Sequence, residues 1–200
     1  RLLEIHKVAA THFYQLLHTE EGLHAYRYLK ERGLSDETIR HFGLGFSSKR
    51  PGELYHYLKS KGYTDAELRE SGLVTIEERG ARDKFWNRVM FPIMDSNSRV
   101  IAFGGRVMGD GEPKYLNSPE TKLFDKSKNL YGLNYARRKR EAYIILCEGY
   151  MDVIALHQAG FASAVASLGT ALTEQQILHI KRTLPNANVT ILSYDSDNDG

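Results

Sequence analysis

The chain has 200 residues, of which 42% are hydrophobic and 26% charged, with a formal net charge of +2 and a mean hydropathy of −0.44. This length is sufficient for one large or two small globular domains. No segment approaches eighteen consecutive apolar residues, which excludes a transmembrane helix, and the first seven residues lack the apolar run of a signal peptide. The single cysteine, Cys147, excludes an intrachain disulfide and a cysteine-based zinc site and is typical of a reducing compartment.

The net charge conceals a basic block between Arg79 and Arg140. This block contains fourteen Lys or Arg and six acids, so it carries +8 and the rest of the chain carries −6. A basic block followed by an acidic end is typical of a nucleic-acid-binding surface beside a metal site. A solvated surface on which charges cluster by chance is the alternative that charge alone leaves open.

The first seventy residues predict helices. Apolar residues recur at helical spacing from Leu2 to Leu17, and Ser35 is expected to be an N-cap. Pro51 is expected at the first helical position, directly before the helical run 53–58. The capping box Thr64-Asp65-Ala66-Glu67 opens another helix.

A small antiparallel sheet is predicted over residues 73–118. Short apolar runs at 89–93 and 100–103 are separated by the polar turn Asp95-Ser96-Asn97-Ser98, which is typical of a hairpin. This sheet would carry many of the basic residues. The chain over 122–140 is expected to be irregular and then helical.

From Glu141 onward, strands alternate with helices. We predict strands over 143–147, 162–166 and 189–192, a helix over 150–159, and a second helix opened by the capping box at 173–176. This βαβαβ pattern implies a parallel sheet with right-handed crossovers. The expected fold class is therefore α/β, with an α+β N-terminal subdomain over 1–140 and an incomplete parallel-sheet subdomain over 141–200.

Acidic residues follow two of the predicted strands. Glu148 comes after the first strand, and Asp195, Asp197 and Asp199 come after the third, while Gly169-Thr170 follows the second. Ligands of open parallel sheets bind beyond the carboxyl ends of the strands, and carboxylates converging there repel one another. Neither acidic segment contains Lys or Arg, so Mg²⁺ or Mn²⁺ is the expected partner.

Three of these assignments stay open at this point. Glu148 is either a metal ligand or a general base. Asp152, one helical turn further on, is either a metal ligand or an acid favoured by the helix dipole. Asp199 either joins the site or occupies an ordinary Asp-Gly turn.

The segment Cys147-Glu148-Gly149-Tyr150-Met151-Asp152-Val153, followed by Asp195-Ser196-Asp197, resembles the acidic signature of Toprim domains. Such domains occur in primases, in type IA and type II topoisomerases and in some nucleases. Further motifs resemble the catalytic core of bacterial replicative primases of the DnaG type, and the resemblance covers nearly all 200 residues. These motifs are Arg32–Ser35, Gly43–Phe46, Arg88–Ile93, Phe103–Arg106, Pro113–Thr121, Phe124–Lys126 and Leu130–Leu133.

The resemblance implies a cytoplasmic enzyme of the replication fork that uses Mg²⁺ or Mn²⁺ to synthesise short RNA primers on single-stranded DNA. Template and incoming NTP would lie between an N-terminal subdomain and a Toprim subdomain. The matching positions imply catalytic roles for Glu148, Asp195 and Asp197, and metal binding by these residues and Asp152. They imply nucleic-acid or NTP binding by Arg88, Arg106, Lys114, Tyr115, Asn117 and Lys126.

The chain departs from the family pattern in two respects. The family motif Asp-Gly-Asp-x-Ala-Gly is Asp195-Ser196-Asp197-Asn198-Asp199-Gly200 here. The chain also starts without Met and ends inside this motif, so we interpret it as a segment of a longer protein. The family's zinc-binding domain and its helicase-binding domain would lie outside the segment, and whether the segment is active alone is left open.

Two other functions are compatible with the acidic signature. One is strand cleavage by a topoisomerase- or nuclease-like Toprim enzyme, and the other is a non-catalytic module that binds single-stranded DNA. Two residues outside the predicted site also have expected roles. Trp86 is favoured as a core aromatic over a base-stacking residue, and Cys147 is expected to be an inert buried thiol.

Overall fold

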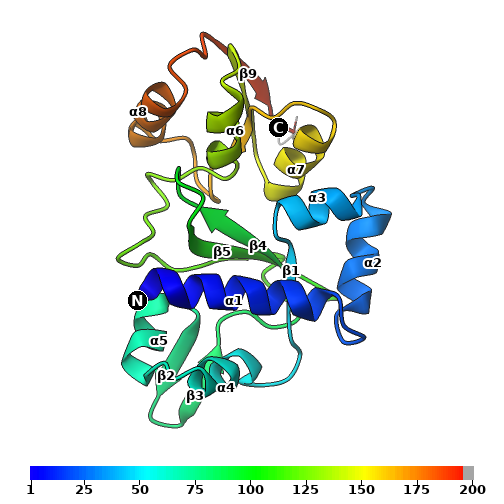
Figure 1. The fold of residues 1–200 in the computed structure, drawn as a ribbon, viewed down its shortest axis with the longest axis vertical. Coiled ribbons are helices and arrows are strands. Elements are labelled where there is room, and N and C mark those ends of the chain that lie inside the picture. The colour runs from blue at the N-terminus through cyan, green and yellow to red at the C-terminus, as the bar shows by residue number, and fades with distance from the viewer. Residues whose placement is uncertain (196–200) are drawn as a thin grey trace, which may run out of the picture. The chain divides into compact units, whose positions relative to one another are not determined.

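The structure is a computed structural model that describes residues 1–195. These residues form two compact units (Figure 1). Unit 1 comprises residues 1–93 and 99–124, and unit 2 comprises residues 94–98 and the chain from 125 onward. Among the described helices, none has the length and apolar character that crossing a membrane requires.

Unit 1 contains five helices and two antiparallel sheets. The helices are α1 (Leu2–Leu17), α2 (Leu23–Glu31), α3 (Asp36–His41), α4 (Glu53–Ser60) and α5 (Asp65–Ser71). The larger sheet has the order β1-β4-β5-β6, and β2 and β3 form a separate hairpin. The strands are β1 (Gly45–Ser47), β2 (Val74–Glu77), β3 (Gly80–Asp83), β4 (Arg88–Met94), β5 (Val100–Val107) and β6 (Tyr115–Asn117).

The apolar face of α1 organises the core of unit 1. Phe13 of α1 packs edge-on against Phe103 of β5, with 5.3 Å between the ring centroids. Leu58 of α4 and Leu68 of α5 belong to the same fully buried cluster. The helical spacing in the sequence therefore correctly identified the face of α1 that is removed from water.

The N-terminus of α4 differs from the prediction. Pro51 lies outside the helix, and Gly52 is the N-cap, with a left-handed φ of 68°. The carboxylate of Asp83, at the end of β3, accepts hydrogen bonds from the backbone N–H groups of Leu54 and Tyr55. A side chain distant in sequence thus caps this helix, which local sequence patterns do not show. The capping residues Ser35 and Thr64 are both confirmed.

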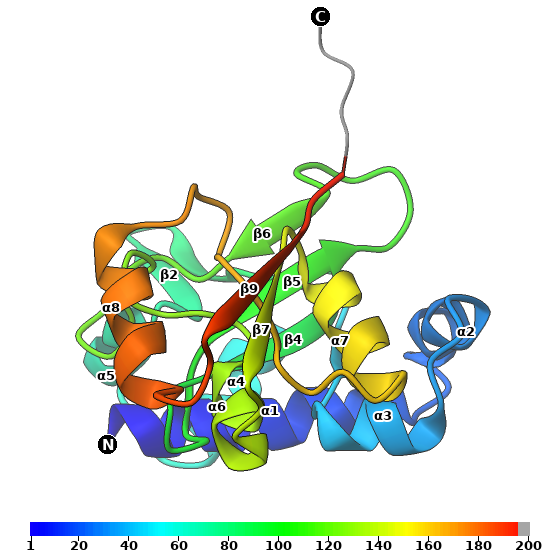
Figure 2. The same ribbon diagram turned by 90° about the horizontal axis from the view of Figure 1, so that it is seen from above.

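Unit 2 is built on a three-stranded parallel sheet, which confirms the predicted fold class. Its strands are β7 (Tyr143–Cys147), β8 (Ala164–Ala166) and β9 (Val189–Ser193), in the order β8-β7-β9. Figure 2 shows β9 lying beside β7. The helices are α6 (Leu133–Lys139), α7 (Tyr150–Gln158) and α8 (Glu174–Thr183).

Residues 125–140 pack within unit 2. Ala136 of α6 lies in one buried cluster with Ile144 and Leu146 of β7. The buried side chain of Gln176, in α8, donates hydrogen bonds to the carbonyl oxygens of Lys126 and Asn129. The division between the compact units at Phe124–Asp125 therefore lies earlier in the chain than the boundary at 140/141 expected from the sequence.

The packing of β1 against α1 predicts that Gly45→Ala destabilises unit 1. A Cβ atom at Gly45 would lie 2.6 Å from the backbone carbonyl carbon of Phe13. Such overpacking costs about 1–3 kcal/mol. Urea unfolding should show this loss, whereas Gly149→Ala should change stability by less than about 1 kcal/mol, because its Cβ would meet Asp152 Oδ2 at an ordinary 3.8 Å. Equal stability of the two variants would contradict this packing.

Candidate catalytic edge and basic strand surface

The parallel register of unit 2 brings the carboxyl ends of its strands to one edge. Cys147 of β7 is paired with Ala166 of β8 and Ser193 of β9. Glu148 is the first residue after β7, and Asp195 is the second after β9; both are exposed. These two predicted site residues therefore follow adjacent strands at the same edge of the sheet.

A cavity of about 550 Å³ lies at this edge. Its polar lining includes Glu148, Ser167 and Thr170, and Leu146 and Leu192 provide apolar walls. Ser167 Oγ donates a 2.8 Å hydrogen bond to the carbonyl oxygen of Thr170, which constrains the loop after β8. No Lys or Arg is among the described residues that line this cavity. Its polar side chains carry oxygen atoms, which are the ligands that hard divalent cations prefer.

The other predicted acids have different placements. Asp152 is exposed in the first turn of α7 and is not among the residues that line the cavity. Asp197 and Asp199 lie outside the described residues. Within residues 1–195, no three His, Cys, Asp or Glu side chains are arranged to hold a metal ion, so the metal-ligand set predicted from the sequence remains a proposal.

Cys147 ends β7 directly before Glu148 and is buried. Burial, with a smaller contribution from the nearby Asp152 carboxylate, raises the pKa of its thiol from 9.0 to about 11. The thiol is therefore protonated at neutral pH, in agreement with the prediction of an inert buried cysteine.

A second group of predicted site residues lies on β5 and β6 of unit 1. Arg106 is directly opposite Tyr115 in the antiparallel register, and Asn117 is opposite Gly104. Lys114 is exposed and immediately precedes β6. The pairing of β5 with β6 thus brings together basic and aromatic side chains that are separated in the sequence.

Tyr28 of α2 joins this group. The guanidinium carbon of Arg106 lies 4.7 Å from the centroid of the Tyr28 ring, a cation–π contact. Tyr115 is 41% exposed, yet burial of its hydroxyl end raises the pKa of the phenol, while the nearby Arg106 and Arg32 act in the opposite direction. No local sequence pattern marks Tyr28 as a site residue, and Arg32 belongs only to one of the motifs that carry the family resemblance.

Arg88 is placed differently from the other predicted basic residues. It is only 5% exposed, and its Nη1 donates to the carbonyl oxygens of Gly105, at 3.2 Å, and Lys114, at 3.4 Å. Burial lowers the pKa of its guanidinium. Arg88 therefore fastens β5 and the start of β6 to β4, which fixes the backbone from which Lys114 extends.

Lys126 belongs to unit 2. It is half-buried, and its carbonyl oxygen accepts a 3.0 Å hydrogen bond from Gln176 Nε2. The carbonyl oxygen of Ser127 accepts a 2.6 Å bond from Thr173 Oγ1. The loop that carries Lys126 is thus attached to the N-terminus of α8, directly after the loop that lines the carboxyl-edge cavity.

The prediction of Trp86 as a core aromatic is wrong. Its side chain is 51% exposed, and the indole Nε1 donates a 2.6 Å hydrogen bond to the carbonyl oxygen of Lys49. Neighbouring Phe85 is buried instead. Both residues lie in the connection between β3 and β4, where Phe85 takes the core position and Trp86 faces solvent.

Comparisons with known proteins find relatives for both parts of the chain. The family model described as DNA primase catalytic core, N-terminal domain, matches residues 12–137, and a Toprim-like model matches residues 145–200. A DNA primase of Clostridium acetobutylicum is 46% identical over 201 residues, which cover 100% of this chain and 33% of that protein. The chain thus spans about a third of the length of this curated relative.

Two solved structures are similar over almost the whole chain. The RNA polymerase domain of Mycobacterium tuberculosis primase DnaG has a TM-score of 0.93 and 34% identity, with 99% of this chain and 67% of that chain covered. A DnaG primase catalytic domain bound to single-stranded DNA has a TM-score of 0.89 and 40% identity, with 100% and 62% covered.

The raised pKa of Cys147 predicts slow reaction with a soluble disulfide reagent. A pKa of about 11 in place of 9.0 reduces the thiolate fraction at pH 8 about a hundredfold. The rate of modification in the folded chain should therefore increase about tenfold per pH unit up to pH 10, and it should rise sharply in urea. Rapid modification of the folded chain at pH 7 would contradict this assignment.

Proposed function

Because the chain belongs to the DNA primase family, through its match to the N-terminal domain of the catalytic core, we propose that it forms part of an enzyme that synthesises short RNA primers on single-stranded DNA by metal-dependent nucleotidyl transfer. The observation that carries this proposal is the placement of Glu148 and Asp195 after adjacent parallel strands, beside an oxygen-lined cavity. The template is single-stranded DNA, and the substrates are NTPs.

The residues at the carboxyl edge fit a hard divalent cation. Glu148 and Asp195 would supply carboxylate oxygens, with Asp152 and Asp197 as further ligands, and Mg²⁺ or Mn²⁺ is the expected ion. When bound, such a cation lowers the pKa of the attacking primer hydroxyl and stabilises negative charge on the phosphate. The carboxylates hold their positions because β7 and β9 are fixed by the ladder of the sheet.

The basic and aromatic residues of unit 1 would bind nucleic acid. Arg106 and Lys114 provide positive charge for phosphates, and Tyr115 exposes a ring on which a base can stack. Tyr28 holds the Arg106 guanidinium, and Arg88 holds the backbone at Lys114, so these two act as positioning residues. Asn117 and, in unit 2, Lys126 are proposed to contribute further polar contacts to template or NTP.

Further partners follow from the family. A replicative helicase would bind through a domain outside this segment, and zinc would be held only by a domain outside it. An RNA primer is the expected product.

We expect Glu148→Gln and Asp195→Asn to reduce primer synthesis at least about a hundredfold in the full-length protein at saturating Mg²⁺, because each removes one carboxylate charge from the metal site. Glu174→Gln, which removes an exposed acid of α8 in the same unit, should retain activity. Unfolding midpoints should be unchanged in all three. Normal synthesis by either site variant would exclude that acid from catalysis.

Lys114→Ala should weaken binding of single-stranded DNA and reduce its salt dependence. Loss of one phosphate contact lowers the slope of log affinity against log salt by about 0.7 for a single strand. Lys59→Ala is the matched control, because Lys59 lies on α4 and pairs with Asp65. The same slope for Lys114→Ala and the unaltered protein would exclude Lys114 from the interface.

A further inference from the structure

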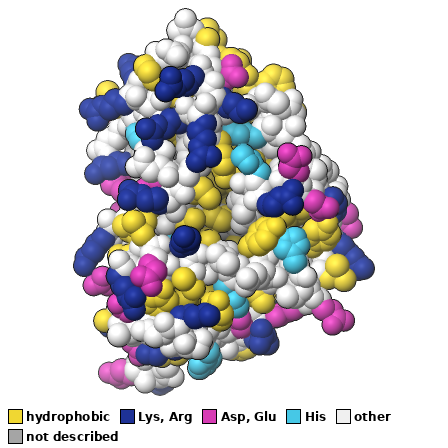
Figure 3. All heavy atoms as spheres, in the orientation of Figure 1, with side chains coloured by type: hydrophobic (Ala, Val, Ile, Leu, Met, Phe, Trp, Pro, Cys, Tyr) yellow, Lys and Arg dark blue, Asp and Glu magenta, His cyan; other side chains and the backbone are white. Residues whose placement is uncertain are grey.

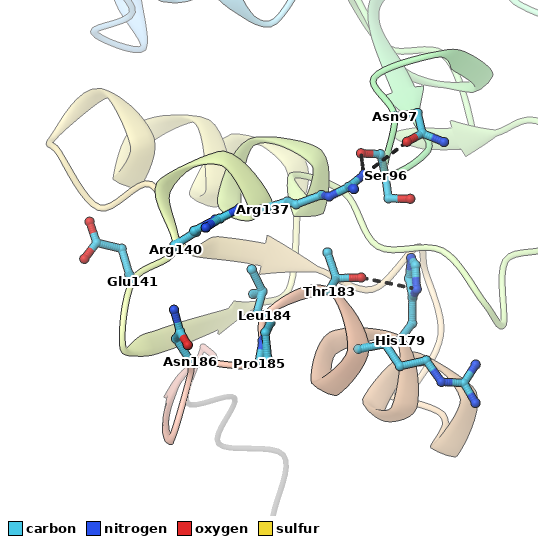
Figure 4. Close-up of a pocket in the computed structure, with 11 residues that line it drawn as sticks. Ser96, Asn97, Arg137, Arg140, Glu141, His179, Thr183, Leu184, Pro185 and Asn186 are labelled. Carbon is cyan, nitrogen blue, oxygen red and sulfur yellow. Dashed lines mark hydrogen bonds between the residues drawn. The ribbon is translucent and has the colours of Figure 1, made fainter.

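A second cavity of unit 2, of about 630 Å³, lies at the opposite edge of the same parallel sheet. Its walls are the C-terminal ends of α6 and α8, the residues that precede β7 and β9, and the turn between β4 and β5. Figure 4 shows Arg137 and Arg140 on one side of this cavity and His179 on another. The predicted catalytic role of the carboxyl edge does not involve these residues.

The cavity is strongly basic. Arg137, Arg140 and Arg182 line it, and Glu141 is the single acid among its described lining residues. Burial, and to a smaller extent the neighbouring Arg182, lower the pKa of His179, which is therefore neutral at pH 7. Figure 3 shows Lys and Arg side chains gathered on the surface over α6 and α8.

The three arginines of this cavity differ in their contacts: the side chain of Arg137 is hydrogen-bonded within unit 2, and those of Arg140 and Arg182 are not bonded to any described residue. Arg137 Nη1 donates hydrogen bonds to the carbonyl oxygen of Ser96, at 2.9 Å, and to Asn97 Oδ1, at 3.1 Å. The guanidinium groups of Arg140 and Arg182 form neither an ion pair nor a hydrogen bond with any residue that the structure describes, whereas the backbone N–H of Arg140 donates to the carbonyl oxygen of Ala136. Their guanidinium groups are free to bind a ligand from solution.

The helix dipole alone does not account for this arrangement. It favours cations at the C-terminal ends of α6 and α8, yet it would be satisfied by side chains that point into solvent. Arg140 also has a left-handed backbone conformation, with a φ of 52°, at a C-cap position where Gly or Asn is ordinarily found. An arginine at this strained position places its charge at the cavity.

We propose that this cavity binds a free nucleotide that carries two or more phosphate groups. The planar guanidinium groups of Arg140 and Arg182 present paired donors that match phosphate oxygens. The exposed ring of Pro185 offers apolar surface for a base or sugar, and the exposed Asn186 amide can hydrogen-bond the polar edge of a base. The volume lies within the range of about 300–1,000 Å³ that is typical of small-molecule sites.

This site is separate from the proposed catalytic one. Glu141 precedes β7 and Glu148 follows it, so the two cavities lie at opposite ends of a five-residue strand, about 17 Å long. The catalytic cavity is lined by a carboxylate without Lys or Arg and repels a triphosphate unless a divalent cation is present. Binding that needs no divalent cation therefore distinguishes the basic cavity.

Calorimetric titration of ATP into the full-length protein in EDTA tests the proposal. We expect one metal-independent binding event, weakened at least about tenfold by Arg140→Gln combined with Arg182→Gln, since each substitution removes charge-assisted hydrogen bonds to phosphate. The matched control is Lys139→Gln combined with Lys181→Gln. It removes the same charge from the adjacent positions, which do not line the cavity, and should bind ATP normally.

Two further measurements identify the site and its ligand. Glu174→Gln and Lys59→Ala should leave the EDTA-resistant binding of ATP unchanged, because neither residue lines the basic cavity. Equal ATP binding by the arginine variant and the unaltered protein would overturn the proposal. A second result would also overturn it: the arginine variant binds ATP normally and loses only its binding to a single-stranded oligonucleotide. The cavity would then bind a nucleic-acid strand and not a free nucleotide.

Discussion

The parallel pairing of β7 with β8 and β9 is the constraint on which the proposed chemistry depends. Hydrogen bonds of the ladder fix Cys147 opposite Ala166 and Ser193, so the residues that follow each strand must lie at one edge. Carboxylates separated by more than forty positions in the chain are thereby placed on adjacent strands. Leu133 and Ala136 of α6 are buried in the same cluster as the sheet residues, and Ile180 of α8 packs against it partly buried, which favours this register.

The positive charge of the chain has several different uses. Arg88 is buried and supports the backbone of β5 and β6, while Arg106 rests on Tyr28 and Lys114 is exposed. Other members of the basic block, Arg137 and Arg140, line a cavity of unit 2. The +8 that suggested a single nucleic-acid surface is therefore divided between the two compact units, and part of it is structural.

Local patterns predicted the elements of this fold well, and long-range contacts explain the failures. The capping boxes at Thr64 and Thr173, and the apolar run of β7, identified their elements because the controlling residues are neighbours in the chain. The prediction that Pro51 is the first residue of α4 was wrong, because the backbone N–H groups at the start of this helix are capped by Asp83 of β3. The same holds for the site residues. The positions of Glu148 and Asp195 could be predicted from the order of strands in the sequence, whereas the contact of Tyr28 with Arg106 depends on how α2 packs.

The carboxylate edge is proposed to serve ribonucleotide transfer and not strand cleavage. The most direct measurement supplies the full-length protein with single-stranded DNA, labelled NTPs and Mg²⁺, and follows both the label and the integrity of the template. Ribonucleotide transfer predicts short labelled RNA complementary to an intact template, with none formed in EDTA. Cleaved template without ribonucleotide incorporation would contradict it.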